Sequence, residues 1–316
     1  MRVRRRARTR SALTRPRRKT YETYETARGK GMSTNAAASV WQGEELDLDA
    51  YLERIGFDGP RVPTLDTLGR LQRAHTTSIP FENVHAVRGL HLPVDLASVQ
   101  ERLVHRRRGG YCFEHVVLFA AALERLGFDL TGITGRVTLG APKVTPATHA
   151  MVVVRFPDDP RSWLCDVGFG SGPTAPIELA DGATLEADGW RYRLQRRPGP
   201  LTDTWSLQQH GADGWFERNI FVLVQQYPVD YRVGSHYVGT HPRSPFVARL
   251  FAQRFTGPEH HQLDGTTWRT HTPDGITVEK EVEPAQLGTL LAETFDLTLD
   301  GDELAAIVQH SAAGPA

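Results

Sequence analysis

The sequence contains little cysteine and no long apolar run. Cys112 and Cys165 are the two cysteines among 316 residues, and neither belongs to a Cys-x-x-Cys pair or to a Cys/His spacing typical of a structural zinc site. Two thiols do not make a disulfide framework, so we expect no metal and a reducing, cytoplasmic compartment in which a cysteine can act as a nucleophile. No apolar stretch reaches the ~18 residues of a membrane-spanning helix, which predicts a soluble protein.

The chain has no excess of either charge, yet the two signs are unevenly distributed. Lys and Arg together number 37, as do Asp and Glu, whereas residues 1–31 alone carry +10 and leave −10 on residues 32–316. We assign residues 1–43 to a disordered basic extension, whose first part lacks the apolar core of a secretory signal. Three interpretations stay open: a segment upstream of a true start at Met32, an arm that binds polyanions, or a targeting segment.

Hydrophobic periodicity changes twice along the rest of the chain. Apolar residues recur at helical spacing over residues 44–128, alternate in short runs over 129–230, and follow a mixed pattern over 231–316. This order favours an α+β protein with a helical bundle, then an antiparallel sheet or barrel, then an α/β part. We expect helices near 48–55, 65–71, 95–104, 112–126, 245–254, 284–294 and 302–309, and strands at 130–139, 149–156, 162–167, 190–194, 204–208, 216–224 and within 266–282.

Cys112 is the first candidate for a catalytic residue. It follows Gly109 and Gly110 directly and opens a predicted amphipathic helix that ends at Gly127. The free N–H groups and positive dipole of a helix N-terminus stabilise an anion, which favours the reactive thiolate. We expect the glycines to let the backbone turn sharply and to leave room for a substrate. A cysteine at a helix start also occurs for packing alone.

A histidine and an aspartate follow at strand ends. His149 opens an apolar strand, and Asp166 follows the strand that contains Cys165. A carboxylate buried there needs a partner. An Asp166–His149–Cys112 chain would orient the imidazole and stabilise a thiolate–imidazolium pair, whereas each residue taken alone fits a core histidine or a turn-forming aspartate. We interpret Cys165 as a small buried hydrophobe.

Several sequence blocks, in this order, resemble the signature blocks of the arylamine N-acetyltransferase family, over roughly residues 44–298. The blocks are Ile-Pro-Phe-Glu-Asn at 79–83, Arg-Gly-Gly-Tyr-Cys-Phe-Glu at 108–114, Thr-His at 148–149, Asp-Val-Gly-Phe-Gly at 166–170, Pro-Val-Asp-Tyr at 228–231 and Thr-His-Pro at 240–242. The resemblance implies a helical bundle bearing the nucleophile (44–128), a β-barrel bearing the histidine and the aspartate (129–230) and an α/β lid (231–316), with a core like that of cysteine proteases.

The resemblance also implies a chemistry. The nucleophile falls on Cys112, the base on His149 and the orienting carboxylate on Asp166. The implied reaction is ping-pong: the thiolate takes an acetyl group from acetyl-CoA and passes it to an aromatic amine, hydrazine or N-hydroxyarylamine. Aromatic residues that match acceptor-binding positions are Phe113, Phe169 and Phe221.

Departures from the family pattern and competing functions remain. The segment before His149 contains Pro146, which removes an N–H donor where many relatives contact CoA phosphates, so Thr145 is a weaker candidate for CoA binding. An amide synthase that closes a macrolactam from a polyketide thioester would use the same triad. A cysteine peptidase or transglutaminase is permitted by the triad but disfavoured by the blocks, and the acidic body argues against a nucleic-acid-binding protein.

Overall fold

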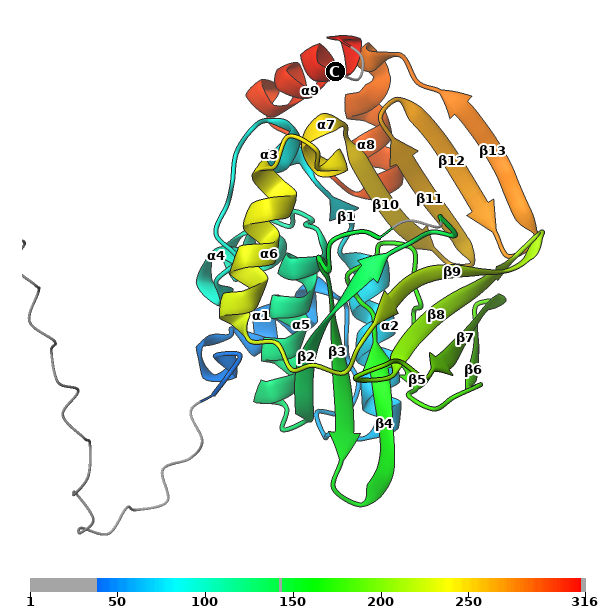
Figure 1. Ribbon diagram of the computed structural model, residues 1–316. Coiled ribbons are helices and arrows are strands. Elements are labelled where there is room, and N and C mark those ends of the chain that lie inside the picture. Colours follow the sequence, from blue (N-terminus) through cyan, green and yellow to red (C-terminus); the bar gives the residue numbers. More distant parts are fainter. Residues whose placement is uncertain (1–38, 142–143, 314–316) are drawn as a thin grey trace, which may run out of the picture. The chain divides into compact units, whose positions relative to one another are not determined.

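The computed structural model describes residues 39–141 and 144–313 (Figure 1). The predicted basic segment of residues 1–31 lies outside these residues. The described part confirms the α+β prediction: helices come first, an eight-stranded antiparallel sheet follows, and helices and a five-stranded antiparallel sheet complete the chain. Within the described part, every helix is too short or too polar to span a lipid bilayer.

Side-chain caps start the first helices where the sequence predicts them. Asp47, Thr64 and Asp95 each accept a hydrogen bond from the backbone N–H three residues later, at 3.0, 3.2 and 3.0 Å. The helical elements before the barrel are η1 (Gly43–Glu45), α1 (Leu48–Arg54), α2 (Leu65–Ser78), α3 (Val84–Val87), α4 (Leu96–Gln100), the π-helical η2 (Glu101–His105) and α5 (Cys112–Arg125).

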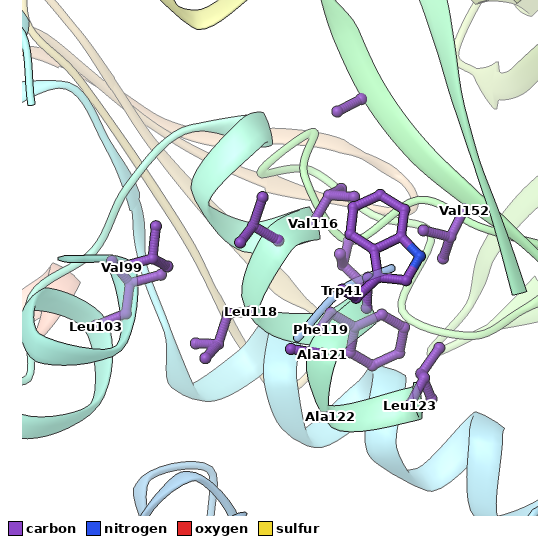
Figure 2. Close-up of a cluster of buried hydrophobic side chains, with 14 of the residues drawn as sticks. Trp41, Val99, Leu103, Val116, Leu118, Phe119, Ala121, Ala122, Leu123 and Val152 are labelled. Atoms are coloured by element: carbon purple, nitrogen blue, oxygen red, sulfur yellow. The ribbon is translucent and has the colours of Figure 1, made fainter. Parts of the chain in front are cut away.

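Helix α5 runs through the centre of the first hydrophobic core. Residues 112–123 of the helix are all buried, which is typical of a helix surrounded by other elements. Figure 2 shows Trp41 and Val152 on one side of this helix and Val99 and Leu103 on the other. Because residues 112–123 are enclosed, the N-terminal residue Cys112 also lies inside the protein, with 6% of its surface exposed.

Within the described part, six of the eight barrel strands confirm the predicted alternation, with shifts of a few residues at their ends, whereas the two short strands at residues 177–178 and 184–187 were not predicted. The strands are β2 (Asp129–Val137), β3 (His149–Phe156), β4 (Asp159–Cys165), β5 (Ile177–Glu178), β6 (Thr184–Ala187), β7 (Trp190–Arg197), β8 (Thr204–Gly211) and β9 (Gly214–Phe221). Their order is β5-β4-β3-β2-β9-β8-β7-β6, and the edge strands β5 and β6 approach each other, so that the sheet is a nearly closed barrel.

The C-terminal part joins the N-terminal part through a shared sheet. Strand β1 (Phe81–Glu82) pairs with β10, with Phe81 opposite Gln253, and the order continues β10-β11-β12-β13. The remaining elements are α6 (Pro228–Thr240), α7 (Pro245–Ala248), β10 (Phe251–Thr256), β11 (Glu259–Asp264), β12 (Thr267–Thr272), β13 (Gly275–Glu281), η3 (Pro284–Gln286), α8 (Leu287–Phe295) and α9 (Gly301–Ala313). The division of the chain at residues 128 and 230 stays a prediction.

The predicted helix at 245–254 is wrong beyond residue 248. Helix α7 begins at Pro245 as expected, but the side chain of Asn83 donates to the carbonyls of Phe246 and Arg249, both at 2.8 Å, and stops the helix. Residues 251–256 pair instead as β10. The sequence pattern also did not indicate β10, β11 or helix α6, which contains two glycines.

Candidate active site

The thiol of Cys112 lies at the first residue of α5, as the sequence predicts. Its Sγ donates a hydrogen bond to the carbonyl oxygen of Thr148 at 3.4 Å, directly before β3. The N–H of the preceding Tyr111 is capped by the carboxylate of Glu114 at 3.0 Å. The sulfur therefore lies between the positive end of a buried helix and the start of the strand that carries His149.

The glycines around Cys112 serve close packing more than substrate access. A Cβ at Gly109 would lie 2.2 Å from the carbonyl oxygen of Pro80, and one at Gly110 would lie 2.6 Å from the carboxylate of Glu114. The room that we expected for a substrate is thus taken by the protein itself. Gly168 has the same role from the other side, because its Cβ would lie 2.8 Å from the Cα of Cys112.

Buried ion pairs hold the segment before Cys112 in place. Glu114 pairs with Arg102, and although burial raises the pKa of this carboxyl, the charges of His85 and Arg102 hold it below its usual range. Arg108 lies 3.8 Å from Glu82 but makes shorter contacts, of 2.8 and 2.7 Å, with Glu303 on α9. The C-terminal helix therefore anchors the Cys112 segment, a partner that the sequence did not suggest.

His149 and Asp166 meet as the sequence predicts. The Nε2 atom of His149 lies 2.9 Å from Oδ1 of Asp166, and 3% of His149 and none of Asp166 is exposed. Burial lowers the pKa of His149, but the charge and hydrogen bond of Asp166 and a hydrogen bond to Cys112 outweigh it and raise the pKa to about 9. Because Asp166 occupies Nε2, Nδ1 is the ring nitrogen left for the thiol.

A second polar side chain orients Asp166. Asn219, fully buried on β9, donates from Nδ2 to the Oδ2 atom of Asp166 at 3.2 Å. Both oxygens of the carboxylate are thereby hydrogen-bonded, which fixes its direction. Sequence reasoning missed this residue, and three polar residues in a row at 217–219, within an otherwise mixed strand, are the sole local signal.

The three predicted aromatic residues occupy different surroundings. Phe169 is partly exposed and its ring lies 5.0 Å from that of His149 at 79°. Phe113 is fully buried, and a Cβ at Gly234 on α6 would lie 2.4 Å from its ring. Phe221 is 3% exposed and stacks on Trp205 in the barrel core. The structure thus places Phe169 at the imidazole and the other two rings within packed cores.

Thr145 lies in the loop before β3, close in the chain to His149. Its hydroxyl donates to the carbonyl of Val137 at 2.8 Å, and its own carbonyl accepts from Arg136 at 2.5 Å. The hydroxyl is therefore engaged with the backbone, whereas the nearby guanidinium of Arg136 supplies a positive charge. Among the described residues, no group of three or more His, Cys, Asp or Glu side chains is arranged to hold a metal ion.

A second histidine system lies behind Cys112 and was not predicted. His115, on α5, lies 3.1 Å from the carbonyl of Gly110 through Nε2 and 3.0 Å from Nε2 of His75 through Nδ1. Tyr51 completes this chain at 3.0 Å from Nδ1 of His75. Burial lowers the pKa of His115 to about 4, against the opposing charge of Glu114. These imidazoles are held neutral.

Comparisons with known proteins show which family this chain resembles. A family model described as N-acetyltransferase matches residues 64–304. The arylamine N-acetyltransferase of Escherichia coli is 33% identical over 273 residues, which cover 83% of this chain and 95% of the relative. The arylamine N-acetyltransferase structure from Nocardia farcinica is 53% identical with a TM-score of 0.83, covering 86% of this chain and 96% of that one. A structure of the Mycobacterium marinum arylamine N-acetyltransferase in complex with CoA is 34% identical with a TM-score of 0.78, covering 83% and 99%.

A thiol, an imidazole and a carboxylate in line, on a helical bundle joined to a β-barrel, suit nucleophilic acyl chemistry at cysteine. The chain belongs to the arylamine N-acetyltransferase family. It is an acyltransferase, which confirms the resemblance that the sequence blocks suggest.

Proposed function

We propose that this chain transfers an acetyl group from acetyl-CoA to an arylamine, arylhydrazine or N-hydroxyarylamine through an acyl-enzyme on Cys112. The observation that carries the proposal is the buried line of Asp166, His149 and Cys112, in a chain whose relatives are named arylamine N-acetyltransferases. One relative is also named N-hydroxyarylamine O-acetyltransferase, and a structural relative is in complex with CoA.

The first half-reaction uses the charged form of the pair. The thiolate of Cys112 attacks the thioester carbonyl of acetyl-CoA, the carbon–sulfur bond to CoA breaks, and the imidazolium of His149 gives its proton to the departing CoA thiolate. The raised pKa of His149, about 9, supports this step because the imidazole carries its proton at neutral pH. Asp166 stabilises the charge and keeps Nδ1 directed at the sulfur.

The second half-reaction runs in the opposite direction. His149, now neutral, takes a proton from the attacking amine, the amine nitrogen bonds to the acyl carbon, and the Cys112 sulfur leaves as a thiolate. The amide product departs and the thiolate–imidazolium pair is restored. Phe169, which contacts His149 and is partly exposed, would also contact an aromatic acceptor.

We assign weaker roles to the other predicted residues. Phe113 and Phe221 would support the residues that line the acceptor site, since both are buried in the surrounding cores. Thr145 would contact CoA through the loop before β3, where Arg136 offers a charge for a phosphate. We further propose small-molecule partners rather than nucleic acid, in view of the −10 charge of residues 32–316, and a cytoplasmic location, in view of two free cysteines.

Intact-protein mass after exposure to acetyl-CoA tests the proposal. We expect one acetyl adduct, which an aryl hydrazine then removes. The buried Cys165 offers a matched control, so that Cys165→Ser should keep the adduct and Cys112→Ser should lose it. An adduct that persists in Cys112→Ser would contradict the assignment. A wild-type protein that stays unmodified would point to a larger acyl donor, as in an amide synthase, an alternative that the names of the relatives do not favour.

A further inference from the structure

Arg218 is a buried cation that the mechanism above does not use. It lies on β9, and 1% of its surface is exposed. Its guanidinium donates to Gln209, and at 2.9 Å to both the hydroxyl of Ser171 and the carbonyl of Gly172, all of which are neutral. No carboxylate among the described residues forms a salt bridge with it. Burying a guanidinium without an acidic partner costs free energy of folding, which suggests that Arg218 has a role beyond packing.

A β-bulge aims Arg218 at the active site. The register between β8 and β9 passes from Leu207 opposite Asn219 to Gln208 opposite Glu217, which leaves Arg218 without a partner on β8. An extra residue of this kind breaks the usual alternation of side chains. Arg218 and its neighbour Asn219 therefore both reach the segment after β4, where Asn219 binds Asp166 and Arg218 binds the backbone six residues later.

The guanidinium also covers the ring that contacts the imidazole. Its Cζ atom lies 4.0 Å from the ring centroid of Phe169, a cation–π contact. The same ring lies 5.0 Å from His149. Arg218, Phe169 and His149 thus form a continuous series of contacts, in which the guanidinium lies over the Phe169 ring and that ring meets the imidazole at 79°. This series limits how far the imidazole can turn away from Cys112.

The charges of the site balance when Arg218 is counted. Asp166 and Arg218 carry one charge of each sign, while Cys112 and His149 are either both neutral or an anion and a cation. The buried group is therefore neutral overall in both states, whereas without Arg218 it would carry one uncompensated negative charge.

We propose that Arg218 is a positioning residue that holds Phe169 against His149 and balances the charge of Asp166. The inference rests on the proposed chemistry of Cys112 and His149. It is distinct from a role in folding, because it demands both a positive charge and contact with the ring.

Alkylation of Cys112 by iodoacetamide at pH 7 tests the inference without an acyl donor. We expect Arg218→Met to slow the rate at least tenfold, and Arg218→Lys, which keeps the charge, to recover it to within about threefold of wild type. Arg193, whose guanidinium lies 4.4 Å over Trp215 elsewhere in the barrel, is the matched control, and Arg193→Met should stay within twofold. Circular dichroism checks the folded fraction of each variant.

Several outcomes would overturn the inference. Folded Arg218→Met within twofold of wild type would do so, as would Arg218→Lys as slow as Arg218→Met. Should Arg218→Met not fold, Phe169→Leu replaces it: we expect about tenfold slower alkylation, and a folded Phe169→Leu variant within twofold of wild type would refute the inference. Failure of acetyl-CoA to acylate the wild type, with the alkylation series as expected, would refute the proposed donor and leave Arg218 assigned.

Discussion

His149 and His115 are both buried imidazoles near the N-terminus of α5, yet their surroundings set opposite protonation states. His149 meets the carboxylate of Asp166, and its pKa is raised to about 9 although burial opposes the charge. His115 meets a carbonyl and a second imidazole, and burial lowers its pKa to about 4. Burial alone therefore does not set the charge of an imidazole; a directly bonded carboxylate decides which of the two is charged.

The hydrogen bonds of the second histidine system, formed by His115, His75 and Tyr51, have a fixed donor and acceptor direction. The carbonyl of Gly110 can only accept, so His115 donates to it from Nε2 and accepts at Nδ1 from His75, which in turn accepts from the hydroxyl of Tyr51. A chain in this order is fully satisfied with both rings neutral. A small cavity lined by both Asp166 and His115 lies between the two systems. One system is thus suited to proton transfer and the other to holding the backbone before Cys112.

The largest effect should come from removing the charged imidazole. We expect His149→Ala to lower the single-turnover rate of Cys112 acetylation about 10³-fold or more, because it removes both the acid and the partner of the thiolate. Rapid-quench mass spectrometry measures the rate. His115→Gln, which keeps a donor for Gly110, should lose less than tenfold. Comparable losses in both variants would show that the two histidines do not differ in the way described.

The next effect tests whether the carboxylate makes the difference. Asp166→Asn should make His149 resemble His115, with a neutral imidazole at pH 7. We expect acetylation to fall by about 10²-fold or more and the alkylation profile of Cys112 to move to higher pH. Circular dichroism separates this from unfolding, because the change also alters the bond to Asn219. An unchanged alkylation profile in folded Asp166→Asn would refute the ion pair.

Stability should respond to pH with opposite signs at the two histidines. The raised pKa of His149 contributes stability that is full below pH ~6.5 and is lost as pH rises toward 9. The lowered pKa of His115 means that the unfolded chain binds more protons between pH ~6.5 and 4, so stability falls as pH falls through that window. Each effect should amount to about 1–3 kcal/mol in the free energy of unfolding.

Urea unfolding from pH 4.5 to 9 measures both parts of the stability curve: the loss at alkaline pH (the alkaline limb) and the loss at acid pH (the acid limb). Relative to wild type, His149→Gln should flatten the alkaline limb and His115→Gln the acid limb. Carboxyl groups also contribute to the loss of stability at acid pH, so each variant is compared with wild type at the same pH. A His115→Gln variant whose stability falls with acid as steeply as that of wild type would show that this imidazole is not held neutral in the folded protein.

The sequence predicted the parts of the site that depend on local pattern. Strand β3 begins at His149 as expected, and Cys112 opens α5, because apolar periodicity and flanking glycines specify these elements locally. The predicted helix at 245–254 was wrong in its second half because a distant side chain, Asn83, ends it and a distant strand, β1, pairs with residues 252–253. Local propensity cannot report such partners.

The missing parts of the site were beyond local pattern for the same reason. Asn219 and Arg218 reach the active site through a bulge, whose position depends on the register between β8 and β9. His75 and His115 lie 40 positions apart in the chain and meet where α2 packs on α5. The blocks of sequence indicated the proposed nucleophile, base and orienting carboxylate, whereas the residues that pack around them became evident from the structure.

The smallest effects on acetylation should come from Tyr51 and Asn219, the residues at the outer ends of the two hydrogen-bonded systems. Tyr51 is fully buried, and burial raises its pKa, so its hydroxyl keeps the proton that it donates to His75. Tyr51→Phe leaves Nδ1 of His75 as a buried acceptor without a donor, which should lower the free energy of unfolding by about 1–2 kcal/mol. Acetylation of Cys112 should stay within about twofold, because the carbonyl of Gly110 is also held by the N–H of Glu82 at 2.9 Å.

Asn219→Ala is the matching change at the site of His149. Asn219 hydrogen-bonds to Asp166 there, just as Tyr51 hydrogen-bonds to His75 in the second histidine system. We expect it to slow acetylation about five- to tenfold, because a carboxylate that loses one of its two donors directs the imidazole less well. Thermal unfolding and single-turnover acetylation are measured on both variants. If Tyr51→Phe slows acetylation as much as Asn219→Ala does, the neutral histidine chain must take part in positioning the thiol, and the division between a reactive and a supporting system would have to be abandoned.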